Sequence, residues 1–164
     1  MVIWLFKKCH IFNMHKKFLM TTRTKQRLDS DLIRLKNRLS EVLLEMGDAA
    51  KNNPDLRENF AYMESERDSE YIKGRIMEIR EKIAFSKIIN PVLGTKKIKI
   101  GSKVTIKFLK TGEKVTYTIL GEEDALTKPG EWLNYKSRLG QVLLDRLEEE
   151  LEFNDSKIKV LKIH

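Results

Sequence analysis

Cysteine and histidine are nearly absent from this 164-residue chain. The single cysteine, Cys9, excludes an internal disulfide and any zinc site built on cysteine ligands. Apart from His10 and His15, the only histidine is His164, which leaves little material for histidine-based acid–base catalysis. Any chemistry must therefore use carboxylates, lysines or groups that a partner supplies.

A long hydrophobic run is also missing. The longest unbroken apolar run in residues 1–19 is Met1 to Phe6, far below the roughly 20 residues that a membrane-spanning helix needs. No small-residue cleavage site follows, as a signal peptide would require. We therefore predict no transmembrane segment and a cytoplasmic location. Residues 1–19 are predicted to be a disordered extension or an upstream start, with Met14 or Met20 opening the working protein; a helix on a membrane surface is the alternative.

Basic residues outnumber acidic ones, 32 to 24, for a formal charge of +8. Four lysines and no acids lie in residues 1–19, so the chain from Met20 onward carries +4. A basic balance suits a nucleic-acid or nucleoprotein partner and says nothing about sequence specificity. With 34% charged and 41% hydrophobic residues, the composition favours helices with long solvated faces over a compact α/β enzyme.

Two apolar series follow the spacing of paired helices. The first series is Leu28, Leu32, Leu35, Leu39, Val42 and Met46, and the second is Ile72, Ile76, Ile79 and Ile83. Gly47 is predicted to end the first helix, with a polar turn over residues 48–54. The second helix is predicted to run from Asp55 to about Phe85. An antiparallel coiled-coil hairpin about 45 Å long is therefore expected within residues 20–90.

After Lys97 the hydrophobic period changes from 3.6 to 2. Apolar and polar residues alternate in several expected strands, at 103–108, 115–119 and on both sides of 154–156. Residues 139–147 show helical spacing instead. The predicted fold class is therefore α+β: the helical hairpin, then a small C-terminal antiparallel β-sheet domain with one helix over residues 97–164.

Four short motifs stand in order along the chain: Asp55-Leu-Arg-Glu-Asn59 with Tyr62, Tyr71–Ile79, Ile119–Ala125 and Ser137–Leu144. Together they resemble the Gre family of transcript-cleavage (transcription elongation) factors over residues 24–164. The resemblance implies an FKBP-like C-terminal domain. This sequence departs from the family pattern by an insertion at 48–54, by Arg138 in place of a typical proline, and by a short last hairpin.

The resemblance implies a partner and a role for the hairpin tip. The chain would bind bacterial RNA polymerase in its secondary channel and stimulate cleavage of backtracked RNA, without being an enzyme itself. Asp55 and Glu58 would be the catalytic tip acids and share a Mg²⁺ of the polymerase active site, with Asp48 in reserve. The free protein is expected to hold no cofactor tightly and to be a monomer. From the residues alone, Asp55 and Glu58 favour a helix-capping box.

Two further groups of side chains are candidates for contacts in such a complex. Basic residues on the hairpin would steady the nascent RNA, or would simply form a solvated flank: Arg34, Arg38, Arg57, Lys73 and Arg80. Residues of the C-terminal domain would dock on the polymerase: Ser137, Arg138 and Leu139. Two other readings stay open: a channel regulator that does not promote cleavage, and a coiled-coil adaptor whose tip is replaceable.

Overall fold

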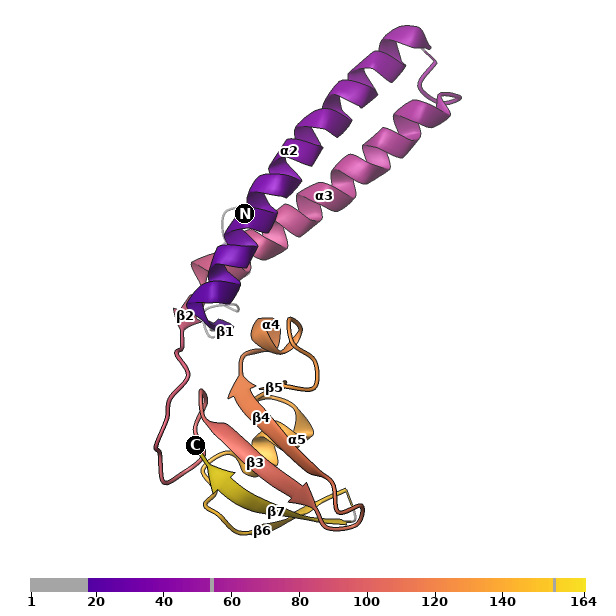
Figure 1. Ribbon diagram of the computed structural model, residues 1–164. Helices are drawn as coiled ribbons and strands as arrows, with labels where there is room; N and C mark the ends of the chain where they lie inside the picture. Colours follow the sequence, from indigo (N-terminus) through magenta and orange to yellow (C-terminus); the bar gives the residue numbers. More distant parts are fainter. Residues whose placement is uncertain (1–17, 54, 155) are drawn as a thin grey trace, which may run out of the picture. The chain divides into compact units, whose positions relative to one another are not determined.

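The computed structural model describes residues 18–53, 55–154 and 156–164 (Figure 1). The chain divides into two compact units. One is the helical segment Lys25–Ala84, and the other joins the chain up to Thr24 with Phe85–His164. Within the described ranges, no helix combines the length and the apolar character that crossing a membrane requires.

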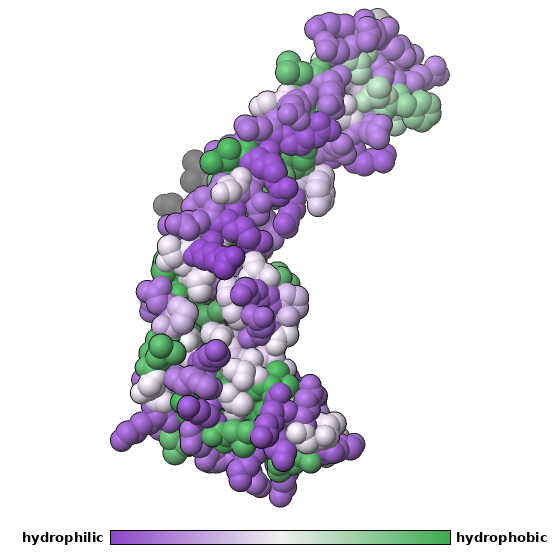
Figure 2. All heavy atoms as spheres, in the orientation of Figure 1, coloured by the Kyte–Doolittle hydropathy of each residue, from purple (hydrophilic) through white to green (hydrophobic). Residues whose placement is uncertain are grey.

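Two long helices, α2 (Thr22–Asn52) and α3 (Phe60–Ala84), form the hairpin. Its core contains Val42, Ile72 and Ile76, with three half-buried leucines packed against them: Leu32, Leu35 and Leu39. The apolar seam predicted from the spacing is thereby confirmed. Hydrophilic residues cover most of the visible surface of this unit (Figure 2), as expected for a two-helix structure with a single narrow apolar stripe on each helix.

The predicted helix boundaries at the tip are wrong. Gly47 does not end α2, which continues to Asn52, where the Asn53 amide still donates to the Ala49 carbonyl at 3.1 Å. A glycine ends a helix when it takes up a left-handed conformation, and Gly47 is not among the residues with positive φ. Residues 48–52, predicted as part of a polar turn, therefore continue α2. The second helix begins at Phe60, five residues later than predicted.

The C-terminal domain is a five-stranded sheet in the order β5-β4-β3-β7-β6. Its strands are β3 (Lys103–Phe108), β4 (Lys114–Leu120), β5 (Trp132–Asn134), β6 (Glu150–Phe153) and β7 (Ser156–Ile163). Helix α5 (Arg138–Leu143) contributes Leu139 and Leu143 to the core on one face of the sheet (Figure 1). The α+β fold class and the strands at 103–108 and 115–119 are confirmed.

The domain differs from the prediction in three details. The pairing of β4 with β5 is parallel, so the sheet is not purely antiparallel. A second short helix, α4, spans Glu122–Ala125. Helix α5 stops at Leu143, short of the predicted 147, because the chain turns at Asp145 (φ 61°) and pairs with Ile98 through Asp145 N–H (2.8 Å) and the Arg146 carbonyl (2.9 Å).

A short parallel pair joins β1 (Phe18–Met20) to β2 (Ser86–Ile88). Met20 is fully buried. Phe18 and Leu19 therefore belong to the folded chain, although we predicted an extension through residue 19; the remainder of that segment lies outside the described residues. Strands of three residues carry too little alternation to be recognised from sequence.

Candidate functional site

Asn59 holds the tip of the hairpin together. Its side chain is 6% exposed, and its Nδ2 donates to the carbonyls of Ala49 (2.8 Å) and Asn53 (2.9 Å). Its Oδ1 accepts from the Tyr62 amide at 3.0 Å, the N-cap interaction that starts α3. One amide side chain thus joins the end of α2 to the beginning of α3 and fixes the loop between them.

Asp55 and Glu58 lie in that loop, before α3, and both are exposed. Asp55 forms a turn: its Oδ1 accepts from the Arg57 amide (3.2 Å), and its carbonyl accepts from the Glu58 amide (3.2 Å). The capping-box interpretation of Asp55 and Glu58 is therefore wrong, because Asn59 occupies the N-cap position. The turn leaves both carboxylates directed to solvent from a loop whose two ends are tied.

The reserve acid, Asp48, lies on the flank of α2. Its carboxylate forms an ion pair with Lys51 at 2.9 Å, and its side chain is 70% exposed. Asp48 is thus separated from Asp55 and Glu58 by the last turn of the helix and is partly neutralised. The first choice of acids therefore lies in the tip loop, and the reserve acid lies on α2.

The candidate RNA-binding cations of the hairpin differ in whether they form ion pairs with neighbouring acids. Arg34 pairs with Asp31 at 2.8 Å. Arg38 pairs with Glu41 (3.2 Å) and Glu45 (3.1 Å), and hydrogen bonding to Glu41 above all raises the pKa of the Arg38 guanidinium.

The other three candidate cations lie nearer the tip or along α3. Lys73 lies 3.6 Å from Glu70. Arg57 and Arg80 are exposed, and neither forms an ion pair with another described residue. Arg57 is also placed between the two loop acids in sequence, so it is the cation nearest to them along the chain.

The predicted docking residues play unequal parts. Ser137 is the N-cap of α5, where its Oγ accepts from the Gly140 amide at 3.1 Å. Leu139 is 9% exposed and belongs to the core, so its prediction as a docking residue needs correction. Gly140 lets α5 approach closely, since a Cβ there would lie 2.4 Å from the Asn134 carbonyl oxygen. Only Arg138 of the predicted set is exposed.

Both parts of the chain match known protein families. Residues 18–88 match the description "Transcription elongation factor, N-terminal", and residues 93–164 match "Transcription elongation factor, GreA/GreB, C-term". The chain belongs to the GreA/GreB family of transcription elongation factors.

Similar proteins agree with this assignment. The chain is 35% identical to a transcription elongation factor GreA of Neisseria meningitidis serogroup A, over 70% of this chain and 74% of that protein. It is 32% identical to a GreA of Methylococcus capsulatus, over 80% of this chain and 84% of that protein. A solved structure of GreA factor homolog 1 (Gfh1) of Thermus thermophilus has a TM-score of 0.42 and 19% identity, and covers 91% of this chain and 99% of that one. A likeness at this level carries no weight for function.

One segment of this Gre-family chain has a structural role that the sequence did not reveal. In the motif Ile119–Ala125, Asp124 is fully buried and accepts hydrogen bonds from Thr21 and Thr24 at the start of α2. Only the acidic character of the segment was visible beforehand, and nothing in it indicated a partner about 100 residues earlier.

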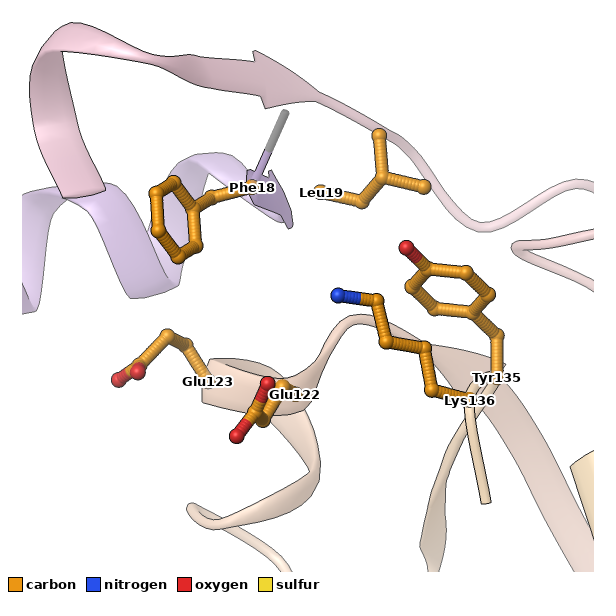
Figure 3. Close-up of a pocket in the computed structure, with 6 residues that line it drawn as sticks. All are labelled: Phe18, Leu19, Glu122, Glu123, Tyr135 and Lys136. Carbon is orange, nitrogen blue, oxygen red and sulfur yellow. The ribbon is translucent and has the colours of Figure 1, made fainter. Parts of the chain in front are cut away.

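A small pocket lies beside this contact (Figure 3). It contains about 10 Å³ of free space, which is about what a single water molecule needs. The ammonium end of Lys136 points into it (Figure 3). Its lining comes from β1, α4 and the segment after β5: Phe18, Leu19, Glu122, Glu123, Tyr135 and Lys136. The pocket is too small for a substrate. The candidate functional site is the hairpin tip, where the exposed acids of the family motif lie.

Proposed function

We propose that this Gre-family chain binds bacterial RNA polymerase through the secondary channel and stimulates the polymerase's own hydrolysis of backtracked RNA. The observation that carries the proposal is the loop tied by Asn59, which presents Asp55 and Glu58 to solvent at the end of a two-helix hairpin. A narrow helical hairpin with carboxylates at its tip suits delivery of those groups into a confined active site. The chain acts as an activator and not as an enzyme by itself.

The donor set of the tip fits a shared Mg²⁺. Carboxylate oxygens are ligands that Mg²⁺ prefers, and it is commonly held by one or two carboxylates together with substrate phosphates. Among the described residues, no group of three or more His, Cys, Asp or Glu could hold a metal. Asp55 and Glu58 would thus hold the ion only together with groups of the polymerase and the RNA. Once bound, such an ion supplies Lewis-acid stabilisation and an activated water for phosphodiester hydrolysis.

The chain's own groups would place these carboxylates and steady the nascent RNA. Asn59 fixes the loop, so less conformational entropy is lost when the acids engage. Of the five candidate cations we favour Arg57 and Arg80 for RNA phosphate, because Arg34, Arg38 and Lys73 are occupied by neighbouring acids. In the C-terminal domain, Arg138 would meet the polymerase, with α5 held in place by Ser137 and Leu139.

Transcript cleavage by a stalled, backtracked polymerase tests the proposal. Wild-type protein should shorten the RNA in a Mg²⁺-dependent reaction. The double variant Asp55→Asn/Glu58→Gln should lose this activity and still bind the polymerase. A matched control, Glu64→Gln/Glu66→Gln, removes the same charge from exposed positions of α3 and should retain cleavage. Full cleavage by the Asp55/Glu58 variant would exclude the assigned role of the tip acids.

A regulator that occupies the channel without promoting cleavage is the competing function. It is motivated by two departures from the family pattern in the sequence, the segment 48–54 before the tip motif and Arg138 in place of a typical proline. Wild-type protein that binds polymerase tightly, alters elongation and never shortens the RNA would establish this second function. An adaptor with a replaceable tip would instead leave the Asp55/Glu58 variant fully active in every assay.

A further inference from the structure

From residue 18 onward, the net positive charge is concentrated in residues 85–164. Residues 85–164 contain 15 Lys and Arg against 11 Asp and Glu, whereas Lys25–Ala84 contains 12 against 13. The proposed cleavage function uses the tip of the hairpin and one exposed arginine of the C-terminal domain. It therefore leaves this excess of lysine unexplained.

The lysines gather on the outer face of the sheet. Val104 and Ile106 of β3 are fully buried beneath α5, so Lys103, Thr105 and Lys107 alternate onto the opposite face. The neighbouring strands add the residues paired with these positions, namely Thr118, Thr116 and Lys114 on β4 and Lys162 and Lys159 on β7. We refer to these eight residues as the basic face.

A β-bulge on β7 enlarges the basic face. Ile106 pairs with Val160, but Thr105 pairs with Lys162, so Leu161 is the extra residue. Without the bulge, Lys162 would follow Val160 by two residues and point into the core. The bulge changes the phase of the strand, so both Lys159 and Lys162 lie on the outer face.

Three lysines lie side by side in one row across the face. Lys107 pairs in register with Lys114 on one side and with Lys159 on the other. Like charges directly opposite each other destabilise a sheet. Among the described residues, Lys159 alone of the three forms an ion pair, with Glu150 on β6 at 3.6 Å. An arrangement that works against folding is explained if an anionic partner occupies the face.

We propose that the basic face binds the phosphate backbone of double-stranded DNA. The lysine ammonium groups are donors for phosphate oxygens. The hydroxyl of Thr105 is already hydrogen-bonded to Thr116 (2.9 Å) and to His164 Nε2 (3.0 Å), so the lysines carry the proposal. Single strands are bound by stacking on exposed aromatic rings, but Phe108 and Tyr117 pack against the core. At the edge of the face, the ring of Trp132 lies under the Lys128 ammonium, 5.4 Å from its centroid. This chemistry fits the backbone of a duplex, read without regard to sequence.

Fluorescence anisotropy with a labelled 20-base-pair duplex and the full chain tests the proposal without polymerase. The variant Lys107→Gln/Lys114→Gln/Lys159→Gln should weaken binding at least tenfold at low salt. The slope of log K against log salt should become shallower by about 2.7, since each phosphate contact contributes roughly 0.9.

A matched control variant separates the effect of the basic face from the effect of the net charge. Lys87→Gln/Lys96→Gln/Lys97→Gln removes the same charge from exposed positions outside the face and should change affinity less than about twofold. Both variants keep the lysines of residues 1–17. Single-stranded RNA should bind more weakly than the duplex. Equal losses in the two variants, or wild-type protein that fails to bind the duplex, would overturn the proposal.

Two further measurements test the chemical class of the partner and the stability of the triple variant. Polyglutamate that binds as tightly as the duplex would assign the face to an acidic protein surface and reject DNA. The thermal midpoint of the triple variant should not fall below that of wild type. The substitutions remove repulsion between paired lysines, and the exposed Lys159–Glu150 ion pair lost with them contributes little. If the triple variant fails to fold, Lys107→Gln alone must still reduce the salt slope by about 0.9; an unchanged slope contradicts the proposal.

Discussion

The carboxylate of Asp124 accepts a hydrogen bond of 2.6 Å from the hydroxyl of Thr21, 103 residues earlier in the chain. It also accepts from the Thr21 amide at 3.0 Å and from the Thr24 hydroxyl. Thr21 in turn accepts from the Thr24 amide at 3.3 Å, which caps the start of α2. A negative charge at a helix N-terminus is favoured by the helix dipole. Asp124 therefore completes the cap of α2, and the hydrogen bonds that it accepts there compensate the cost of burying its carboxylate.

Replacing Asp124 by alanine should strongly destabilise this part of the fold. The substitution leaves the Thr21 amide and two threonine hydroxyls without their acceptor, and each buried unsatisfied group costs about 1–3 kcal/mol. We expect a loss of about 3 kcal/mol or more, and faster amide exchange at Thr21. Urea unfolding and hydrogen exchange measure both effects. Glu122→Ala, at an exposed position of the same helix, is the control and should change stability by less than about 0.5 kcal/mol.

Gly121 and Gly74 should respond oppositely to alanine. A Cβ at Gly121 would lie 1.7 Å from the carbonyl oxygen of Leu19, so the backbone of β1 would have to move; we expect a loss of about 1–3 kcal/mol. Gly74 lies inside α3 with no atom within 4 Å of its built Cβ. Gly74→Ala should stabilise the hairpin by about 0.5–1 kcal/mol. If the thermal unfolding midpoint shifts in the same direction in both variants, these assignments are wrong.

Asn59→Ala should uncouple the tip from the helices while leaving Asp55 and Glu58 in the sequence. The variant loses the N-cap of α3 and both bonds to α2, and a lost cap alone costs about 1–2 kcal/mol. Under the proposed function, cleavage should fall although both carboxylates are present. Asn59→Asp keeps the cap acceptor and loses the donors, so its stability and its cleavage activity should lie between those of wild type and Asn59→Ala. If both cleavage and the hydrogen exchange of the tip amides are unaltered, the hydrogen bonds of the Asn59 side chain are dispensable.

Glu78 should make hairpin stability depend on acid pH. A hydrogen bond from Lys82 above all lowers the pKa of the Glu78 carboxyl, with Arg75 contributing. A lowered folded-state pKa stabilises the fold above the unfolded value, near 4.3, and this contribution is lost as pH falls through the folded-state value. Glu78→Gln should therefore be less stable than wild type at pH 7, and the difference should shrink by pH 3. Urea midpoints at both pH values test this, with Glu64→Gln as the control.

The hairpin seam was predictable because helical burial follows a local period. Leu35 and Ile76, for instance, belong to series whose 3- and 4-residue steps are visible without any structure. The strands at 103–108 and 115–119 were equally visible from alternation. The helix ends at the tip were not, because Asn59 selects them through bonds to Ala49 and Asn53 that exist only once the chain has turned back.

The sequence by itself determined the α+β class, the apolar seam, the main strands and the position of the acidic motif. Tertiary structure decided that Asp55 and Glu58 lie in a loop and not on a helix, that Leu139 is buried, and that Asp124 meets Thr21. It also decided, through one bulge on β7, that Lys162 faces outward. The physical reason is common to all of these: periodicity records which face of an element is buried, whereas close approaches between distant segments depend on where the backbone of the other segment lies.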